Sequence, residues 1–308
     1  MLAYAVRRLL QMIPILIGTT FLIFALVFAL PGDPIATLSP DRPLSPSLLH
    51  AIRDRYHLND PLIVQYGYYM RDLLQGDLGV DFHNRPVAQL LADRWPVTLQ
   101  LALTAWVLKV VVGLGLGFWS GLRHGRPADH FALGFTVLFL ALPGFVVAMG
   151  AQWLFGFQLD WLPVVGAEAG WPLAFVLPAA VMALESSAGL SRLTRSSLVE
   201  VLRSEYLRTA RAKGLPPGRV IWGHALRNAM IPVVTYLGLS LAGMLGGAVI
   251  IEYIFNLPGV GGLMVDALEL QEGTVVVGIA TVLVLAYLLF NLLVDLSYGL
   301  IDPRMRHD

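Results

Sequence analysis

The sequence predicts an all-α integral membrane protein with about six transmembrane helices, and two observations lead to this fold class. Of the 308 residues, 56% belong to the hydrophobic set and only 14% are charged, with a mean hydropathy of +0.69. Soluble domains carry about 25% charged residues. The apolar residues are also gathered into long runs, and a helix needs about 20 of them to cross a hydrocarbon core of roughly 30 Å.

Six runs of the chain meet this length criterion. The second contains Lys109 and the fourth contains Glu185, whereas the other four hold no ionised side chain. The fourth run is also the shortest, so a re-entrant or buried segment is an alternative there. A cleaved signal peptide is the weaker interpretation of the first run, because that run is too long and Pro31-Gly32-Asp33 is no small-residue cleavage site. The predicted spans are 9–30, 97–121, 131–155, 172–190, 230–251 and 274–294.

The lysines and arginines place both chain ends in the cytoplasm. Fourteen of the 21 lie before the first span, between spans two and three, between spans four and five, or after span six. Cytoplasmic loops are enriched in these residues. The loops 156–171 and 252–273 contain none, and are therefore predicted to be extracytoplasmic. The segment 31–96 has six arginines but also eight aspartates, and a loop of this length is translocated with little regard to charge.

The extracytoplasmic segment 31–96 is predicted to be partly helical. Proline-rich turns precede a helical stretch at 45–56. A second, amphipathic stretch follows Asn59-Asp60-Pro61 and ends at Gly76-Asp77-Leu78-Gly79. Such a segment can cover the outer mouth of a pathway or dock a partner, and an ordered connector without a ligand is the alternative.

The predicted cytoplasmic loop 191–229 is strongly basic, with eight Lys and Arg residues against two glutamates. Within it, Ser204 stands at the N-cap position of a short helix whose first turn contains Glu205, where the helix dipole favours an anion. Gly214 stands where the glycine after a helix is expected, and Pro216-Pro217 prevents continuation. The loop therefore contains a short helix with well-defined ends.

This helix is amphipathic, because Tyr206, Leu207, Ala210 and Gly214 form one apolar strip. Small residues on a sharply delimited helix favour docking into a groove of another protein. Ordinary basic enrichment, or a helix lying on anionic membrane lipid, is the alternative. The candidate docking residues are Glu205, Tyr206, Leu207, Arg208, Thr209, Ala210, Arg211, Ala212, Lys213, Gly214 and Leu215.

The stretch 205–232 resembles the cytoplasmic coupling loop of type I importer permeases of the ATP-binding cassette class. It is most similar to their dipeptide, oligopeptide and nickel branch. Gly214 matches the glycine of the family pattern Glu-Ala-Ala-x3-Gly, and Ile231-Pro232 matches its distal hydrophobic-Pro pair. Arg208-Thr209-Ala210 fill the Glu-Ala-Ala positions, so only the last alanine fits.

Two other stretches resemble the same branch. The opening, from Arg7-Arg8 to Leu30-Pro31-Gly32-Asp33-Pro34, is similar to the start of its first permease subunit. The segment after the fifth span is similar to the motif that the branch carries there. The residues that match in this second stretch are Glu252, Phe255, Asn256, Pro258, Gly259 and Gly261.

The resemblance implies a domain organisation and a set of partners. A permease of this type would have an N-terminal transmembrane helix at 1–30, the extracytoplasmic segment 31–96 and a permease core at 97–302. It would pair with a second homologous permease subunit, two ATPase subunits that use ATP and Mg, and an extracytoplasmic substrate-binding protein, in a bacterial cytoplasmic (inner) membrane. Helix 205–214 would couple ATPase closure to alternating access for di- or oligopeptides, or for nickel chelates.

Other function classes have less support. No phosphate-binding Gly-x4-Gly-Lys-Ser/Thr loop, His-Glu-x-x-His pair or Gly-x-Ser-x-Gly elbow occurs, so catalytic residues are not expected. The chain has no cysteine and no histidine pair at helical spacing, so we expect it to bind no metal or cofactor. Zero net charge gives no sign of a nucleic acid partner. The main alternative is a secondary carrier or channel. An ion-coupled carrier would use Lys109 and Glu185 as its coupling site. A cargo pathway, a pair that fixes helix packing, and side chains that reach the membrane interface are the other interpretations of these two charges.

Overall fold

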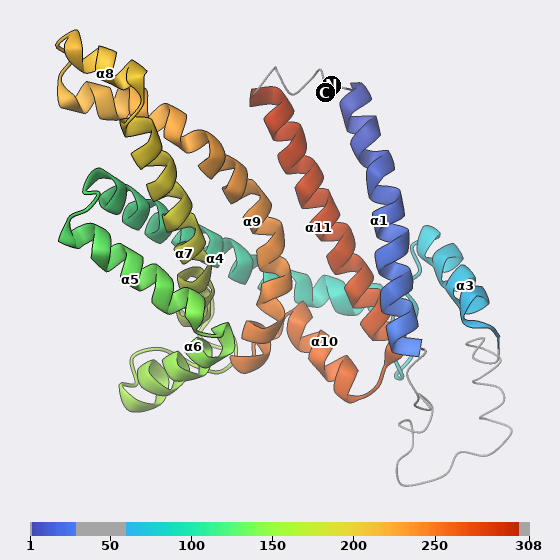
Figure 1. Cartoon of the computed structure of the whole chain (residues 1–308). Helices are drawn as coiled ribbons and strands as arrows, with labels where there is room; N and C mark the ends of the chain where they lie inside the picture. The colour runs from blue at the N-terminus through green and yellow to red at the C-terminus, as the bar shows by residue number, and fades with distance from the viewer. Residues whose placement is uncertain (1, 29–59, 302–308) are drawn as a thin grey trace, which may run out of the picture.

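The structure is a computed structural model that describes residues 2–28 and 60–301, and these ranges fold into helices with one isolated bridge between Val80 and Pro86. Figure 1 shows their arrangement. The elements are α1 (Leu2–Phe28), α3 (Leu62–Leu74), α4 (Val87–Leu122), α5 (Pro127–Ala141), α6 (Gly144–Ala151), η2 (Gln152–Gln158), α7 (Leu173–Leu202), α8 (Glu205–Ala212), η3 (Arg219–Ala225), α9 (Leu226–Ile254), α10 (Val260–Glu269) and α11 (Gly273–Ile301).

Five long helices of the described chain can cross a membrane by length and composition: α1, α4, α7, α9 together with η3, and α11. A bent pair, α5 with α6–η2, makes a sixth candidate. The predicted number of about six is confirmed when this pair counts as one span. The expected uninterrupted span at 131–155 is wrong, because the pair bends by 100°. The bend falls at Pro143, which lacks an amide hydrogen and holds Leu142 in extended backbone.

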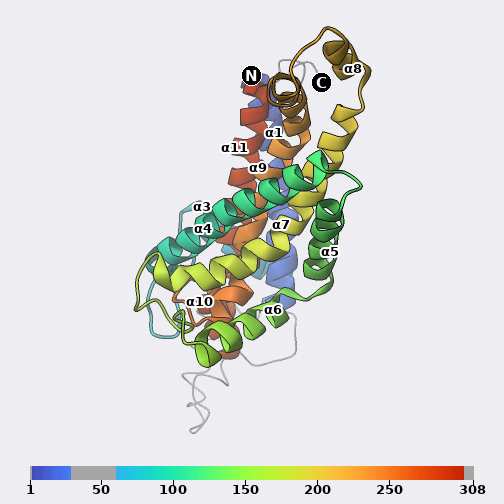
Figure 2. The same cartoon turned by 90° about the vertical axis from the view of Figure 1, so that its left-hand side faces the viewer.

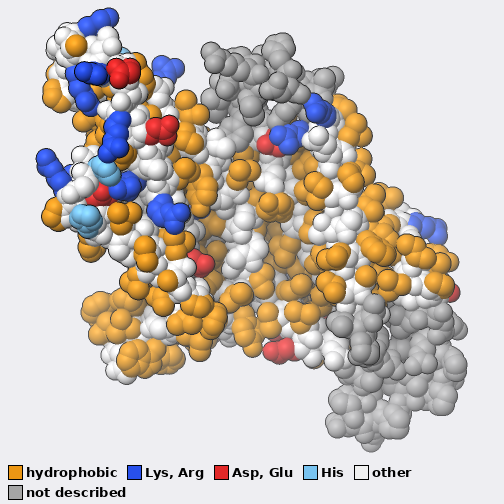
Figure 3. All heavy atoms as spheres, viewed as in Figure 1, with side chains coloured by type: hydrophobic (Ala, Val, Ile, Leu, Met, Phe, Trp, Pro, Cys, Tyr) orange, Lys and Arg blue, Asp and Glu red, His pale blue; other side chains and the backbone are white. Residues whose placement is uncertain are grey.

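The predicted orientation agrees with the arrangement of the helices. The start of α1, the end of α11 and helix α8 lie at one end of the molecule, and α6 and α10 lie at the other (Figure 1). In the face drawn in Figure 3, Lys and Arg side chains gather over α8 and the turn between α4 and α5, whereas none is seen over α6 and α10. The α8 end is therefore cytoplasmic, and the α6–α10 end is extracytoplasmic.

Helix α7 is longer than predicted. It continues to Leu202, twelve residues beyond the expected end of span four, so the loop 191–229 begins as helix. The polar residues of this extension find partners inside the protein: the Thr194 hydroxyl donates to the Leu190 carbonyl at 2.8 Å, and the Ser197 hydroxyl donates to the Ala229 carbonyl at 2.8 Å. The re-entrant alternative for this segment is wrong.

Helices α4 and α7 form the closest helix contact, which we call the glycine seam. Three residues of α4, each one turn from the next, are glycines and have no side chain. The backbones of α4 and α7 therefore come close together, as they do in membrane helix pairs with small residues at the interface. A Cβ added at Gly117 would lie 2.5 Å from Cβ of Thr194 and 2.9 Å from the Ser191 carbonyl oxygen. Figure 2 shows α4 crossing the other helices obliquely. The seam consists of Gly113, Gly117 and Gly121 against Leu190, Thr194 and Leu198.

The predicted amphipathic stretch after Pro61 is confirmed as α3. Tyr66 is buried against α1, where its hydroxyl donates to the Ile17 carbonyl at 3.0 Å and lies 2.9 Å from the Thr20 hydroxyl. The Tyr69 hydroxyl reaches Thr281 of α11 at 2.6 Å. Helix α3 therefore ties α1 to α11 at the extracytoplasmic end. The helix expected at 45–56 lies outside the described residues.

Candidate coupling surface and extracytoplasmic pocket

Helix α8 ends as the sequence predicts. The amide of Gly214 donates to the Arg211 carbonyl at 2.9 Å, and the amide of Leu215 donates to the Ala210 carbonyl at 3.4 Å. Gly214 has φ +79°, so this pair of bonds is the Schellman motif, in which glycine is favoured. The position of Gly214 after the helix is thereby confirmed.

The start of α8 differs in one detail. Ser204 occupies the N-cap position, but its hydroxyl donates back to the Val201 carbonyl at 2.6 Å and makes no cap bond. Glu205 stands in the first turn as predicted, 3.8 Å from Arg208, and both side chains are more than four-fifths exposed. A pair this exposed contributes little to stability.

Leu207 anchors α8 to its own chain. Its side chain is fully buried in a cluster with Leu198 of α7, Val220 of η3 and Ala229 of α9, and Ala210 packs at the cluster edge. The side chain of Leu207 is therefore covered by its own chain, whereas Ala210 is only partly buried, and docking of the rest of the apolar strip on a partner stays a prediction. An isolated two-turn helix has no core of its own, so its apolar side chains turn inward onto the bundle.

A different surface of α8 remains available to a partner, and we call it the outward face. Tyr206 is 44% exposed, and its hydroxyl accepts a hydrogen bond from Asn228 at 2.7 Å, which fixes the ring at the surface. The other members of the outward face are exposed as well. The outward face consists of Glu205, Tyr206, Arg208, Thr209, Ala212 and Lys213.

A buried ion pair joins α5 to α7 at the cytoplasmic end, and we call it the clamp. Asp129 of α5 is 1% exposed and receives a two-pronged contact from Arg195 of α7: Nε donates to Oδ1 at 2.5 Å and Nη2 donates to Oδ2 at 2.8 Å. The Ser120 hydroxyl and the Gly125 amide donate to the same carboxylate at 2.5 and 2.8 Å, and His124 Nδ1 lies 3.1 Å from Oδ2. The clamp joins the cytoplasmic ends of α4, α5 and α7.

The motif after the fifth span is organised around a fully buried carboxylate. Glu252 stands in the last turn of α9, and its Oε2 accepts a hydrogen bond from the Gly261 amide at 2.6 Å. A Cβ at Gly259 would overlap this carboxylate, so glycine lets the turn pack directly on it. The motif residues that the sequence singled out are thus brought together, with Phe255 in the core and Asn256 and Pro258 at the surface.

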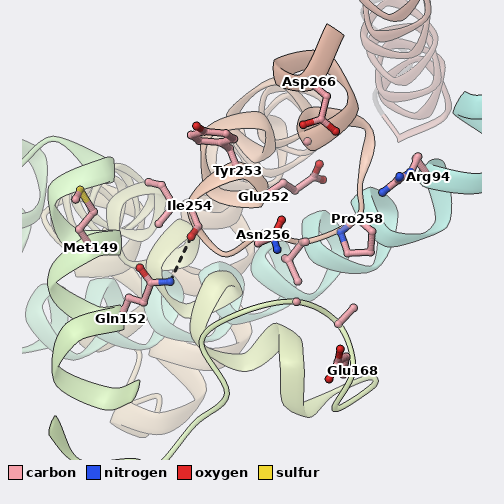
Figure 4. Close-up of a pocket in the computed structure, with 14 residues that line it drawn as sticks. Arg94, Met149, Gln152, Glu168, Glu252, Tyr253, Ile254, Asn256, Pro258 and Asp266 are labelled. Carbon is pink, nitrogen blue, oxygen red and sulfur yellow. Dashed lines mark hydrogen bonds between the residues drawn. The ribbon is translucent and has the colours of Figure 1, made fainter. Parts of the chain in front are cut away.

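These surface residues line a pocket of about 770 Å³ at the extracytoplasmic end. Such a volume is typical of small-ligand sites, which span roughly 300–1,000 Å³. Figure 4 shows Glu252 and Asp266 on the side of α9 and α10, with Glu168 across from them and Arg94 beside the turn. The Gln152 side chain joins η2 to the end of α9 in the pocket wall by donating a hydrogen bond to the Ile254 carbonyl at 3.3 Å. Because the carboxylate of Glu252 is buried behind the wall, the pocket offers two carboxylates, of Glu168 and Asp266, and the guanidinium of Arg94.

The two intramembrane charges do not pair. Lys109 of α4 is 1% exposed, and its Nζ lies 4.8 Å from the centroid of the Tyr236 ring. Among the described residues, no carboxylate lies within 4.0 Å of it. Glu185 lies on the exposed side of α7, with its carboxylate against Gly144 at the start of α6. A direct pair between these two charges is absent from the described part of the chain, and whether they serve a cargo pathway, ion coupling or helix packing stays a prediction.

Sequence reasoning missed the clamp. In the sequence, Arg195 stands among the basic residues of a predicted loop, and Asp129 stands in the turn before the third predicted span. The available signal was an aspartate two residues before the predicted third span, because a carboxylate this close to the membrane core is costly without a partner. Its partner stands 66 residues later in the chain, so spacing could not identify it.

Comparison with protein families identifies the class. Residues 113–307 match the family described as binding-protein-dependent transport system inner membrane component, and residues 1–102 match the N-terminal component of that system. The chain belongs to this family. It is a permease subunit of an ATP-binding cassette importer in the bacterial inner membrane, and not an enzyme.

Two kinds of relative match over the whole chain. The dipeptide transport system permease protein DppB of Alkalihalophilus pseudofirmus is 35% identical over 334 residues, with both chains fully covered. The glutathione transport system permease proteins GsiC of Pectobacterium atrosepticum and Escherichia coli are 38% and 37% identical, again with full coverage. These relatives place the chain in the peptide permease branch, as the resemblance implied.

Two solved structures share the fold. An amino acid ABC transporter crystallised with histidines has a TM-score of 0.55 at 16% identity, covering 68% of this chain and 93% of its own. The inward-facing MetNI methionine ABC transporter has a TM-score of 0.54 at 15% identity, covering 70% and 97%. At this identity they support the fold of the permease core alone.

Proposed function

We propose that this chain forms half of the translocation pathway of an importer for dipeptides or short peptides such as glutathione, and that ATPase subunits drive it through α8. The observation that carries the proposal is the two-sided character of α8. Leu207 fixes one side of the helix to the ends of α7, η3 and α9, and the outward face projects from the membrane at the cytoplasmic end. A force on the outward face is thereby delivered to two membrane spans, α7 and η3–α9.

The family to which the chain belongs supports the partners that we propose. Two ATPase subunits, which bind ATP and Mg, would dock on the α8 of this chain and of a second homologous permease. A substrate-binding protein would deliver cargo at the opposite end, where the pocket opens beside α10. The carboxylates and the guanidinium of the pocket suit a zwitterionic peptide, and the names of the relatives support peptides as cargo. Nickel chelates are the alternative cargo.

The experiment is reconstitution of the complex. The tagged chain is co-expressed with its neighbouring transport genes, purified in mild detergent and placed in liposomes with candidate binding proteins. We expect a second permease and two ATPase subunits to copurify, and labelled dipeptide or glutathione to enter only with ATP. Uptake of a nickel chelate instead would change the cargo assignment. Uptake by the chain alone, driven by an ion gradient, would contradict the proposal and favour a secondary carrier.

A further inference from the structure

The clamp is the strongest polar contact that α5 makes with the bundle. The side of α5 that faces inward carries the small residues Ala132 and Thr136 besides Asp129, whereas large apolar residues such as Phe131 and Val137 face outward. Small side chains bury little apolar area, so they hold a helix weakly. Among the described residues, Asp129 makes every hydrogen bond that joins α5 to α7.

The clamp also lies on the mechanical route from α8. Leu207 of α8 packs in the same cluster as Leu198 of α7, and a Cβ added at Gly121 of α4 would lie 3.0 Å from Leu198. Arg195 stands one turn before Leu198 on the same helix. Displacement of α8 therefore reaches α7 and the glycine seam first, and the arginine passes it on to α5.

The far end of α5 leads to the pocket. Helix α5 continues through the bend at Pro143 into α6 and η2, and these two elements line the pocket with Met149 and Gln152. Movement of α5 at its cytoplasmic end thus carries through one short, continuous segment to the pocket wall at the opposite side of the membrane.

We propose that Asp129 and Arg195 are positioning residues that make α4, α5 and α7 move as one body, so that displacement of α8 changes the pocket at the opposite end. The proposal rests on the proposed function, since it needs ATPases that act on α8. Without the clamp, the seam still joins α4 to α7 and Ala148 still packs α6 on α7, but the cytoplasmic end of α5 no longer follows α7, so its movement is not passed on to the pocket wall.

The test uses the assembled complex with Asp129→Asn or Arg195→Gln in this chain. Asp129→Asn removes the charge and leaves the helix unchanged, and Arg195→Gln keeps the bonds from Ser120 and Gly125 to the carboxylate. The matched control is Arg192→Gln, which removes an exposed arginine from the same helix three residues earlier. Assembly, ATP hydrolysis and uptake are measured together, and the ratio of peptide imported to ATP hydrolysed is the readout.

A second readout reports on the pocket directly. The chain contains no cysteine, so Met149→Cys introduces a single thiol at the pocket wall of this subunit. A membrane-impermeant maleimide labels it in the nucleotide-free complex and in the complex trapped with ATP and vanadate. We expect the labelling rate to differ between the two states with the clamp intact, and to be equal in Asp129→Asn and Arg195→Gln.

We expect both clamp variants to assemble and hydrolyse ATP, while import per ATP falls about tenfold, within the roughly 5–150-fold range of coupling between sites. Asp129→Glu, which keeps the carboxylate, should recover part of the loss, and Arg192→Gln should match the wild type. Import per ATP within about twofold of the wild type, which is below that coupling range, would overturn the proposal. Failure of both variants to assemble would make the clamp a folding contact and overturn it too, as would state-independent labelling with the clamp intact. A wild-type complex that imports nothing with ATP would instead refute the proposed function.

Discussion

The glycine seam makes the sharpest stability prediction. Gly117→Ala adds one carbon where the nearest atoms are Cβ of Thr194 at 2.5 Å and a backbone oxygen at 2.9 Å. Neither atom can rotate away, so α4 and α7 must separate. On the same helix, a Cβ at Gly115 meets nothing within 4 Å. Gly115→Ala is therefore the matched control.

The magnitude follows from the comparison of the two variants. Both gain the same helix propensity from alanine, about 1 kcal/mol at most, and this gain cancels in their difference. Overpacking a tight contact costs about 1–3 kcal/mol. The unfolding temperature shifts by roughly 2–4 °C per kcal/mol in a chain of about 150–250 residues, and by somewhat less in a longer chain. We therefore expect Gly117→Ala to unfold several degrees below Gly115→Ala.

The assay is thermal unfolding of each detergent-solubilised variant, followed by fluorescence-detected size exclusion after heating. Insertion in the membrane is checked first by the amount of full-length protein in the membrane fraction. Equal midpoints for Gly117→Ala and Gly115→Ala would show that the helices are not in backbone contact at this level, and would refute the seam.

Three further predictions concern single side chains. Leu207→Ala should lower the free energy that holds α8 on the bundle by about 2–5 kcal/mol, as large-to-small changes at buried sites do. Import should fall and segment 203–218 should become sensitive to protease, while the membrane helices stay folded. Unchanged protease protection and unchanged import would contradict the anchoring role of Leu207. Burial raises the pKa of Glu272, so the stabilising contribution of this residue is present at low pH and is lost as pH rises through the raised pKa. Glu272→Gln should therefore raise the unfolding temperature at pH 8 but not at pH 4. An equal effect at both pH values would be contrary to this account. Lys109→Met removes a buried cation whose described contact is the Tyr236 ring, so stability should be unchanged or higher, and a large loss of thermal stability would reveal a carboxylate partner.

The long helices and their orientation could be predicted from sequence because they depend on two simple quantities. A run of about 20 apolar residues has few stable arrangements besides a membrane helix, and the arginines of the loops set the direction of insertion. The end of α8 was predictable for a similar reason, since Gly214 adopts a backbone conformation that other residues rarely accept.

The features that could not be predicted from sequence depend on contacts between distant segments of the chain. The extension of α7 reads as polar loop because Thr194 and Ser197 are polar, and only the packed structure supplies their carbonyl partners. Proline occurs inside four of the long helices without ending them, so the bend at Pro143 could not be singled out. The inward direction of Leu207 depends on α7 and α9, which periodicity within eight residues does not reveal.

The central claim is that the outward face of α8 receives an ATPase, and crosslinking tests it most directly. Ala212→Cys introduces the single thiol of the chain on this face, and a benzophenone maleimide attached there is photoactivated in native membranes that contain the whole transport system. Gln158→Cys, at the opposite end of the molecule, is the control. We predict an adduct between this chain and an ATPase subunit from position 212 and none from position 158. Adducts from position 212 to lipid alone would contradict the account and leave α8 as a helix on the membrane surface.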